Sequence, residues 1–356
     1  MPTDGLAAAP GTAITHPLAA RRILRLAFGT ALCLLFSQLA AWPLSFIAPI
    51  LTLTVLALPL PAPPLKLGLG LVVGLLLPML GGLAILTLME SARWAGILLI
   101  SLALYHSFLF TARGGPAALG IFITMGLTVT VTIGTVSPTL LTVLVQALAA
   151  GAVVGVLFVW VAHALLPDGP AVPRGLPKKA PAAPVDPAEA RRSAFRALLI
   201  VLPVALAFMY MSASAAYTVI MIKVATMGQQ ASVDQSRDMG RSLIASTFWG
   251  GLAAIAAWGL LCVWPSLLLY VLLVLLAGLL FGRRIFSGAS MHPEFSKWSY
   301  AYVTMLIILG PSVLDSPISS GAGSAFWSRL LNFMFIGVYG SVAVAVFDAF
   351  WPKRTN

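Results

Sequence analysis

The sequence predicts an all-α polytopic membrane protein with about 12 transmembrane helices, arranged as two six-helix repeats in parallel orientation. The first observation is compositional: of 356 residues, 60% are hydrophobic and 9% are charged, with a mean hydropathy of +1.00. Because a soluble domain carries about 25% charged residues, a water-soluble globular protein is excluded. The second observation is a series of apolar runs long enough to span a bilayer. The third is a set of landmarks that recurs in the second half of the chain.

The apolar runs predict six spans in each half of the chain, most of them close to the ~20 residues that cross a bilayer. The second and eighth runs are short, so these two spans are the weakest part of the pattern. In the first half the predicted spans are 26–42, 44–60, 67–88, 94–112, 116–136 and 139–166. In the second half they are 194–211, 214–228, 240–263, 265–282, 298–314 and 326–351.

The distribution of basic residues predicts the topology. The formal net charge is +11, and basic residues collect on the cytoplasmic side of membrane proteins, so nucleic acid is not an expected partner. With the N-terminus inside and twelve spans, nearly all of the 21 Lys and Arg residues fall on the cytoplasmic side. Arg93 and Arg329 fall outside, and Lys223 falls within a span. Both termini are therefore expected to be cytoplasmic.

The repeat is predicted from residue pairs that recur in the same order at a nearly constant spacing. Because six helices is an even number, both repeats are expected to have the same orientation, related by an axis along the membrane normal. The recurring pairs are Arg21-Arg22 with Arg191-Arg192, Gly81-Gly82 with Gly250-Gly251, Thr124-Met125 with Thr304-Met305, and Ser137-Pro138 with Ser316-Pro317. The predicted division is a cytoplasmic tail (1–20), the first repeat (21–167), a Pro-rich cytoplasmic linker (168–190), the second repeat (191–352) and a second cytoplasmic tail (353–356).

These features resemble a known family. The Arg-rich start of each repeat, the Gly-rich third span and the segment Met239-Gly240-Arg241-Ser242 are similar to the fusaric acid resistance and aromatic acid exporter superfamily, in particular to its compact bacterial DUF2955 branch. The resemblance implies proton-driven export of small organic anions across the bacterial inner membrane, with a periplasmic adaptor protein as a further partner. Larger members carry a soluble domain between the halves, where this chain has only the linker.

No enzymatic chemistry is predicted. A phosphate-binding loop of the form GxxxxGK[ST] does not occur, so ATP hydrolysis is not expected. The four histidines have no metal-ligand spacing, and the two cysteines, Cys33 and Cys262, are far apart. The chain is therefore expected to bind no metal or other cofactor.

Lys223 is the first candidate for a substrate or ion pathway. It lies within the eighth predicted span, where a charge costs a few kcal/mol on insertion scales. On a helix it would share a polar face with Thr226 and Gln230, and Tyr217 lies near the outer end of the same span. Such a face would attract an anion. The alternative interpretation is that the lysine stem lies in lipid and its ammonium group reaches the interface.

The Ser-Pro pairs before the sixth and twelfth spans are the second candidates. Ser137 and Ser316 are placed to cap these helices, whose N-termini would offer partial positive charge to an anion from both repeats. Capping alone also explains them. Asp315, beside the second pair, is either a titrating group of the pathway or an exposed loop carboxylate.

His163 and Asp348 occupy matching positions at the cytoplasmic ends of the sixth and twelfth spans. If these helices meet, the two side chains would form a proton relay, because a histidine titrates near neutral pH. The alternative is that both face water.

Three functional hypotheses follow. The leading one is a secondary transporter for proton-driven efflux of small organic, including aromatic, acids. An anion channel would need only a fixed positive potential and no titratable coupling group. A non-transporting membrane scaffold or partner subunit would tolerate replacement of Lys223 and its polar face.

Overall fold

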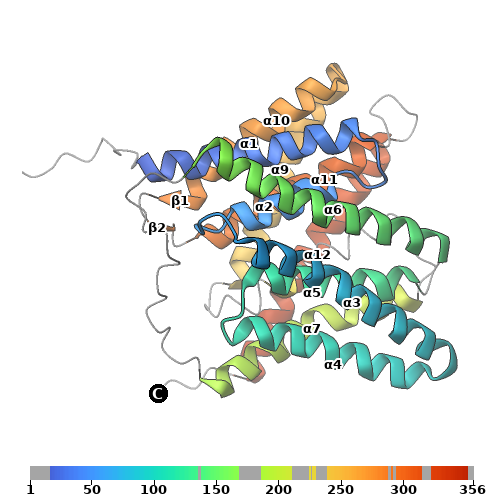
Figure 1. Ribbon diagram of the computed structural model, residues 1–356. Coiled ribbons are helices and arrows are strands. Elements are labelled where there is room, and N and C mark those ends of the chain that lie inside the picture. The colour runs from blue at the N-terminus through green and yellow to red at the C-terminus, as the bar shows by residue number, and fades with distance from the viewer. Residues whose placement is uncertain are drawn as a thin grey trace, which may run out of the picture.

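The computed structural model describes nine stretches of the chain: 17–134, 138–167, 186–210, 224–225, 227–229, 239–287, 290–291, 294–314 and 322–351. These residues are helical apart from short connections and one antiparallel pair of two-residue strands (Figure 1).

In the first half, six helices occupy the predicted spans. They are α1 (Pro17–Leu39), α2 (Ile47–Leu56), α3 (Leu65–Ser91), α4 (Arg93–Ala112), α5 (Ala117–Gly134) and α6 (Pro138–Leu165). The second half contains α7 (Pro187–Tyr210), α9 (Met239–Val263), α10 (Leu267–Ile285), β1 (Phe286–Ser287), β2 (Ser290–Met291), α11 (Phe295–Leu314) and α12 (Ala322–Phe350). Between α7 and α9, the five described residues at 224–225 and 227–229 are helical and buried.

The first helix of each half begins earlier than the apolar pattern predicts. The predicted spans start at residues 26 and 194, whereas α1 starts at Pro17 and α7 at Pro187. In α7 the Asp186 carboxylate accepts a hydrogen bond of 3.0 Å from the backbone N–H of Ala188, and Pro187 takes the first helical position. The helix therefore begins inside the stretch assigned to the linker, and its arginines lie within its first turns.

Seven helices of the described part are long and apolar enough to cross a membrane, which makes the chain a polytopic helical membrane protein. α2 is apolar but has only ten residues, and α1 and α7 carry arginines near their N-termini. The seven spans are Leu65–Met89, Arg93–Ala112, Ala117–Gly134, Leu141–Leu165, Ile244–Val263, Leu267–Ile285 and Gly323–Phe350.

The helices pack in corresponding pairs. α3 packs along α5 and α9 along α11, while α1 packs along α10 and α7 along α4 (Figure 1). Glycines allow close approach in these pairs. For example, a Cβ on Gly278 of α10 would lie 2.7 Å from the Cα atom of Ala27 in α1. Without a hydrophobic driving force in lipid, such small-residue contacts hold membrane helices together.

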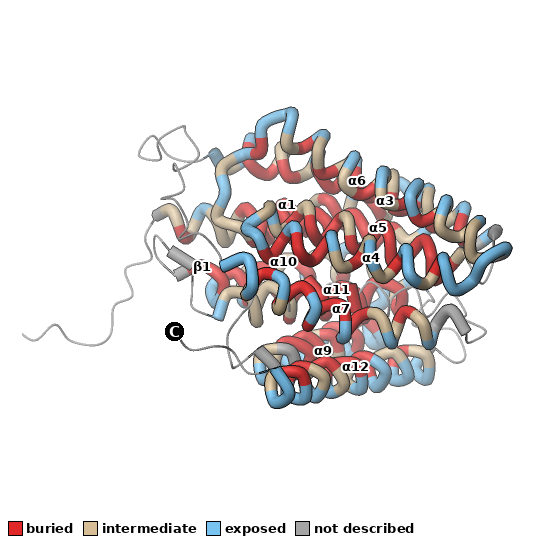
Figure 2. The backbone as a smooth tube through the Cα atoms, turned by 90° about the horizontal axis from the view of Figure 1, so that it is seen from below, coloured by how far each residue is buried: buried red, intermediate tan, exposed pale blue. Residues whose placement is uncertain are grey.

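The interior of the bundle is formed by α2, α5 and α11. All ten residues of α2 are buried, as are residues 301–312 of α11 and most of α5. Figure 2 shows buried residues along the middle of the molecule and exposed residues along the outward sides of α3, α4, α10 and α12. The outward sides carry large apolar side chains such as Leu69, Leu98 and Phe335, as a lipid-facing surface requires.

Candidate functional site

A buried polar network lies between α4, α5 and the helical segment at 227–229. Gln229 donates a hydrogen bond of 2.9 Å from Nε2 to the carbonyl oxygen of Gly120 and a second to Thr124 Oγ1. Thr124 Oγ1 in turn lies 2.8 Å from Ser107 Oγ on α4. Gln229, Thr124 and Ser107 are all buried. Because an unpaired amide costs several kcal/mol in an apolar interior, these contacts fix the position of Gln229.

Gly120 makes this arrangement possible. A Cβ at this position would overlap Thr111 Oγ1 and would lie 2.8 Å from Gln229 Oε1. Only glycine leaves room for the glutamine side chain to reach the backbone of α5.

A strip of threonines continues from the network along α5. Thr124, Thr128 and Thr132 are spaced four residues apart, which places them on one face of the helix. The hydroxyls of Thr128 and Thr132 each donate a 2.7 Å hydrogen bond to the carbonyl four residues earlier. Each hydroxyl therefore satisfies its donor within the helix. Together with Gln229, the strip forms what we term the α5 polar track: Gln229, Ser107, Thr124, Thr128 and Thr132.

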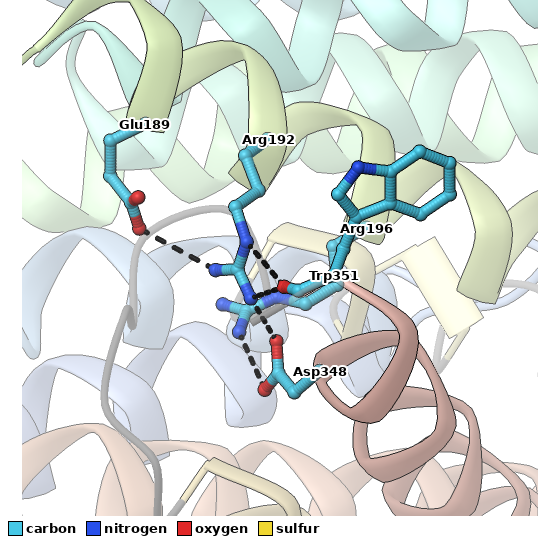
Figure 3. A network of polar contacts seen from close by, with 5 residues as sticks. All are labelled: Glu189, Arg192, Arg196, Asp348 and Trp351. Carbon is cyan, nitrogen blue, oxygen red and sulfur yellow. Dashed lines mark hydrogen bonds and ion pairs between the residues drawn. The ribbon is translucent and has the colours of Figure 1, made fainter. Parts of the chain in front are cut away.

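A second polar cluster lies where the N-terminal part of α7 meets the C-terminal end of α12 (Figure 3). Asp348 accepts from Arg192 Nη2 at 2.6 Å and from Arg196 Nη1 at 3.4 Å. Arg192 also donates from Nε to the carbonyl oxygen of Trp351 at 2.9 Å, and its Nη1 lies 3.6 Å from Glu189 Oε1. The Arg196 side chain is only 2% exposed, so its charge depends on the Asp348 carboxylate.

The first half has a matching contact. Arg25 of α1 donates from Nε and Nη2 to the carbonyl oxygen of Leu166, at 3.2 and 2.9 Å, just after the end of α6. Arg25 of α1 thus binds a carbonyl just after the end of α6, as Arg192 of α7 binds one just after the end of α12. The unpaired carbonyls and negative dipole end of a helix favour this contact.

Of the residues predicted for function, the structure describes only the two assigned to a proton relay. His163 Nδ1 lies 2.8 Å from the carbonyl oxygen of Val159 in its own helix. Asp348 pairs with Arg192 and Arg196 of α7. The other predicted pathway residues lie outside the described part of the chain: Lys223, Tyr217, Thr226, Gln230, Asp315, Ser137 and Ser316.

The α5 polar track was not predicted. Its signal in the sequence is the four-residue spacing of Thr124, Thr128 and Thr132, which places three hydroxyls on one face of a mostly apolar span. Gln229 lies beside the predicted Gln230, but its contacts with α4 and α5 depend on tertiary packing.

An apolar bundle with a polar track buried at its centre defines a multi-pass membrane protein with a hydrogen-bonding interior. Residues 22–162 match the family model described as "Protein of unknown function (DUF2955)", which confirms the resemblance to that family over this part of the chain. No curated protein and no solved structure matches the chain.

Proposed function

We propose that the protein is a secondary transporter of the bacterial inner membrane that uses the proton gradient to export small organic acids, including aromatic ones. The observation that carries the proposal is the buried Gln229–Thr124–Ser107 network. Polar groups at membrane depth are costly, and those retained in a bundle interior characteristically line substrate or ion paths. The amide and hydroxyl oxygens of the α5 polar track can accept hydrogen bonds from water or from the O–H group of a protonated organic acid.

The proposal includes an architecture of twelve spans in two parallel six-helix repeats, with both termini cytoplasmic. Three correspondences support it. The packing of α1 on α10 corresponds to that of α7 on α4, and the packing of α3 on α5 corresponds to that of α9 on α11. The arginine contacts at Leu166 and Trp351 correspond in the same way. Of the described helices, α2, α5 and α11 are buried at the centre, where a substrate path between the repeats would run.

Coupling to protons requires a titratable group on the path, and the α5 polar track contains none. Lys223 and Asp315 remain the proposed groups for anion attraction and proton coupling, because both are placed by sequence next to central helices. Ser137 and Ser316 are proposed to orient helix N-termini toward the substrate.

The proposal is tested by efflux from exporter-deficient cells preloaded with a panel of aromatic and aliphatic acids, with and without the protein, before and after an uncoupler. The expected result is extrusion of an acid against its concentration gradient. This extrusion is expected to stop when the uncoupler is added. Downhill flux that ignores the uncoupler would replace the proposal with an anion channel. No flux for any acid, with or without a coexpressed periplasmic adaptor, would favour a scaffold or partner subunit.

Replacing Gln229 by leucine is expected to lower the initial efflux rate about tenfold, because a lost hydrogen bond to a buried partner costs about 1–3 kcal/mol. The matched control is Gln146→Leu, since Gln146 is exposed on α6. Rates are normalised to the amount of folded protein in the membrane. Equal efflux rates for Gln229→Leu and Gln146→Leu would show that the α5 polar track does not line the transport pathway.

A further inference from the structure

A shallow hollow of about 380 Å³ lies between α4, α7 and α12 on the outer surface of the bundle. Its lining combines guanidinium groups with aromatic rings: Tyr105, Arg191, Arg192, Phe195, Phe347 and Trp351. The hollow is separate from the α5 polar track, which lies in the interior. A basic and aromatic hollow at this place on a membrane protein has the chemistry of an interfacial ligand site.

Arg191 is the cation available to a ligand in this hollow. Its Nε atom donates a 3.1 Å hydrogen bond to the carbonyl oxygen of Pro187, and in the described part of the chain Nη1 and Nη2 have no hydrogen-bond partner. Arg192, by contrast, is held by Asp348, Glu189 and the carbonyl oxygen of Trp351. The two carboxylates neutralise Arg192 and Arg196, so the positive charge of Arg191 remains uncompensated.

The hollow continues into an apolar surface. Along α7, Arg191, Phe195 and Leu199 follow each other at four-residue spacing on one face, a distance of about 12 Å from the basic end toward the middle of the helix. Phe195 and Leu199 are each 40% exposed. The neighbouring helices also carry exposed apolar side chains, among them Leu98 and Leu102 of α4 and Val342 and Val346 of α12.

We propose that this hollow binds an anionic phospholipid. The headgroup phosphate is held by Arg191, the glycerol region lies against Tyr105 and Trp351, and an acyl chain follows the apolar face of α7. Arginine matches a phosphate through several N–H donors, and amphipathic aromatic rings favour the headgroup level of a bilayer. The apolar continuation distinguishes a lipid from a soluble phosphate, which would leave that surface unused.

The test compares lipid retention by native mass spectrometry of the full-length protein from mixed micelles that contain equal amounts of phosphatidylglycerol and phosphatidylcholine with the same acyl chains. The wild-type protein is expected to retain phosphatidylglycerol preferentially. Arg191→Gln is expected to lower that preference about fivefold, the effect of one basic residue at an anionic surface. Arg283→Gln, an exposed arginine in the last turn of α10, is the matched control and should keep the preference.

Three results would overturn the proposal. Unchanged preference in Arg191→Gln would show that the lipid binds elsewhere. Equal retention of both lipids by the wild-type protein would show that the hollow binds acyl chains and does not recognise the anionic headgroup. Displacement of the lipid by millimolar glycerol phosphate would indicate a site for a soluble phosphate. Because Arg191 is exposed and its hydrogen bond lies within its own helix, the variant is expected to fold, and size-exclusion profiles check this.

Discussion

Replacing Gly250 by leucine is expected to prevent α9 from packing along α11 and to eliminate most of the folded protein. A Cβ at this position would overlap the carbonyl oxygen of Ala301 and would lie 2.7 Å from Cβ of Thr304. The backbone of α11 cannot turn aside as a side chain can, so the two helices would have to separate. Overpacking of a tight core costs about 1–3 kcal/mol, and a clash with backbone belongs at or above the upper end of that range. The measurement is the monodisperse fraction in size-exclusion chromatography and its melting temperature.

Gly259→Leu is the matched control for this prediction. Gly259 lies on the same helix, is exposed, and has no atom within 4 Å of an ideal Cβ. It is expected to give wild-type yield and melting temperature. If both variants behave alike, the close approach of α9 and α11 is not what Gly250 provides.

Replacing Asp348 by alanine is expected to lower the free energy of unfolding by about 2 kcal/mol. Loss of one partner from a buried ion pair costs about 3–5 kcal/mol, and the 31% exposure of the Asp348 side chain reduces this. The reason is the Arg196 guanidinium, which is 2% exposed and would lose its carboxylate. Thermal unfolding in a fixed detergent measures the change.

Two further variants separate the effect of the buried charge from that of packing, one at an exposed ion pair elsewhere and one within this cluster. Glu294→Ala removes a carboxylate that pairs with Lys297 at 2.7 Å but is 53% exposed, so its effect is expected to be below about 0.5 kcal/mol. Arg196→Leu combined with Asp348→Leu removes both charges and is expected to recover most of the lost stability. A double variant as unstable as Asp348→Ala would contradict the ion-pair explanation.

The spans were predictable from the sequence because a long apolar run between breakers has few structural alternatives. α3, α4 and α6 lie within a few residues of their predicted bounds. The second span is shorter than predicted: Leu44 adopts a positive φ of 55° before α2, and a proline-rich stretch follows it. Proline lacks a backbone N–H and cannot continue a helix there.

The polar sites were less predictable because they depend on which helices meet. The spacing of Thr124, Thr128 and Thr132 is local, but the contact between Gln229 and Gly120 joins segments distant in sequence. In the same way, Asp348 and His163 have matching positions, yet Asp348 is bound by α7, which no local pattern indicates. Whether a segment forms a helix depends on residues close in sequence. Which helices pack against each other depends on the tertiary structure of the whole bundle.

The pairing of α1 with α10 and of α4 with α7 has a consequence for how the protein is made. During synthesis, α1 leaves the ribosome long before α10. The face of α1 that packs on α10 is therefore without its final neighbour until α10 is inserted into the membrane. The same holds for α4 until α7 is inserted. A nascent chain that stops after α6 would therefore leave unsatisfied surfaces on both helices, and quality-control proteases would be expected to remove it. We therefore expect neither half to be stable alone, because each needs helices of the other half to cover its packing faces.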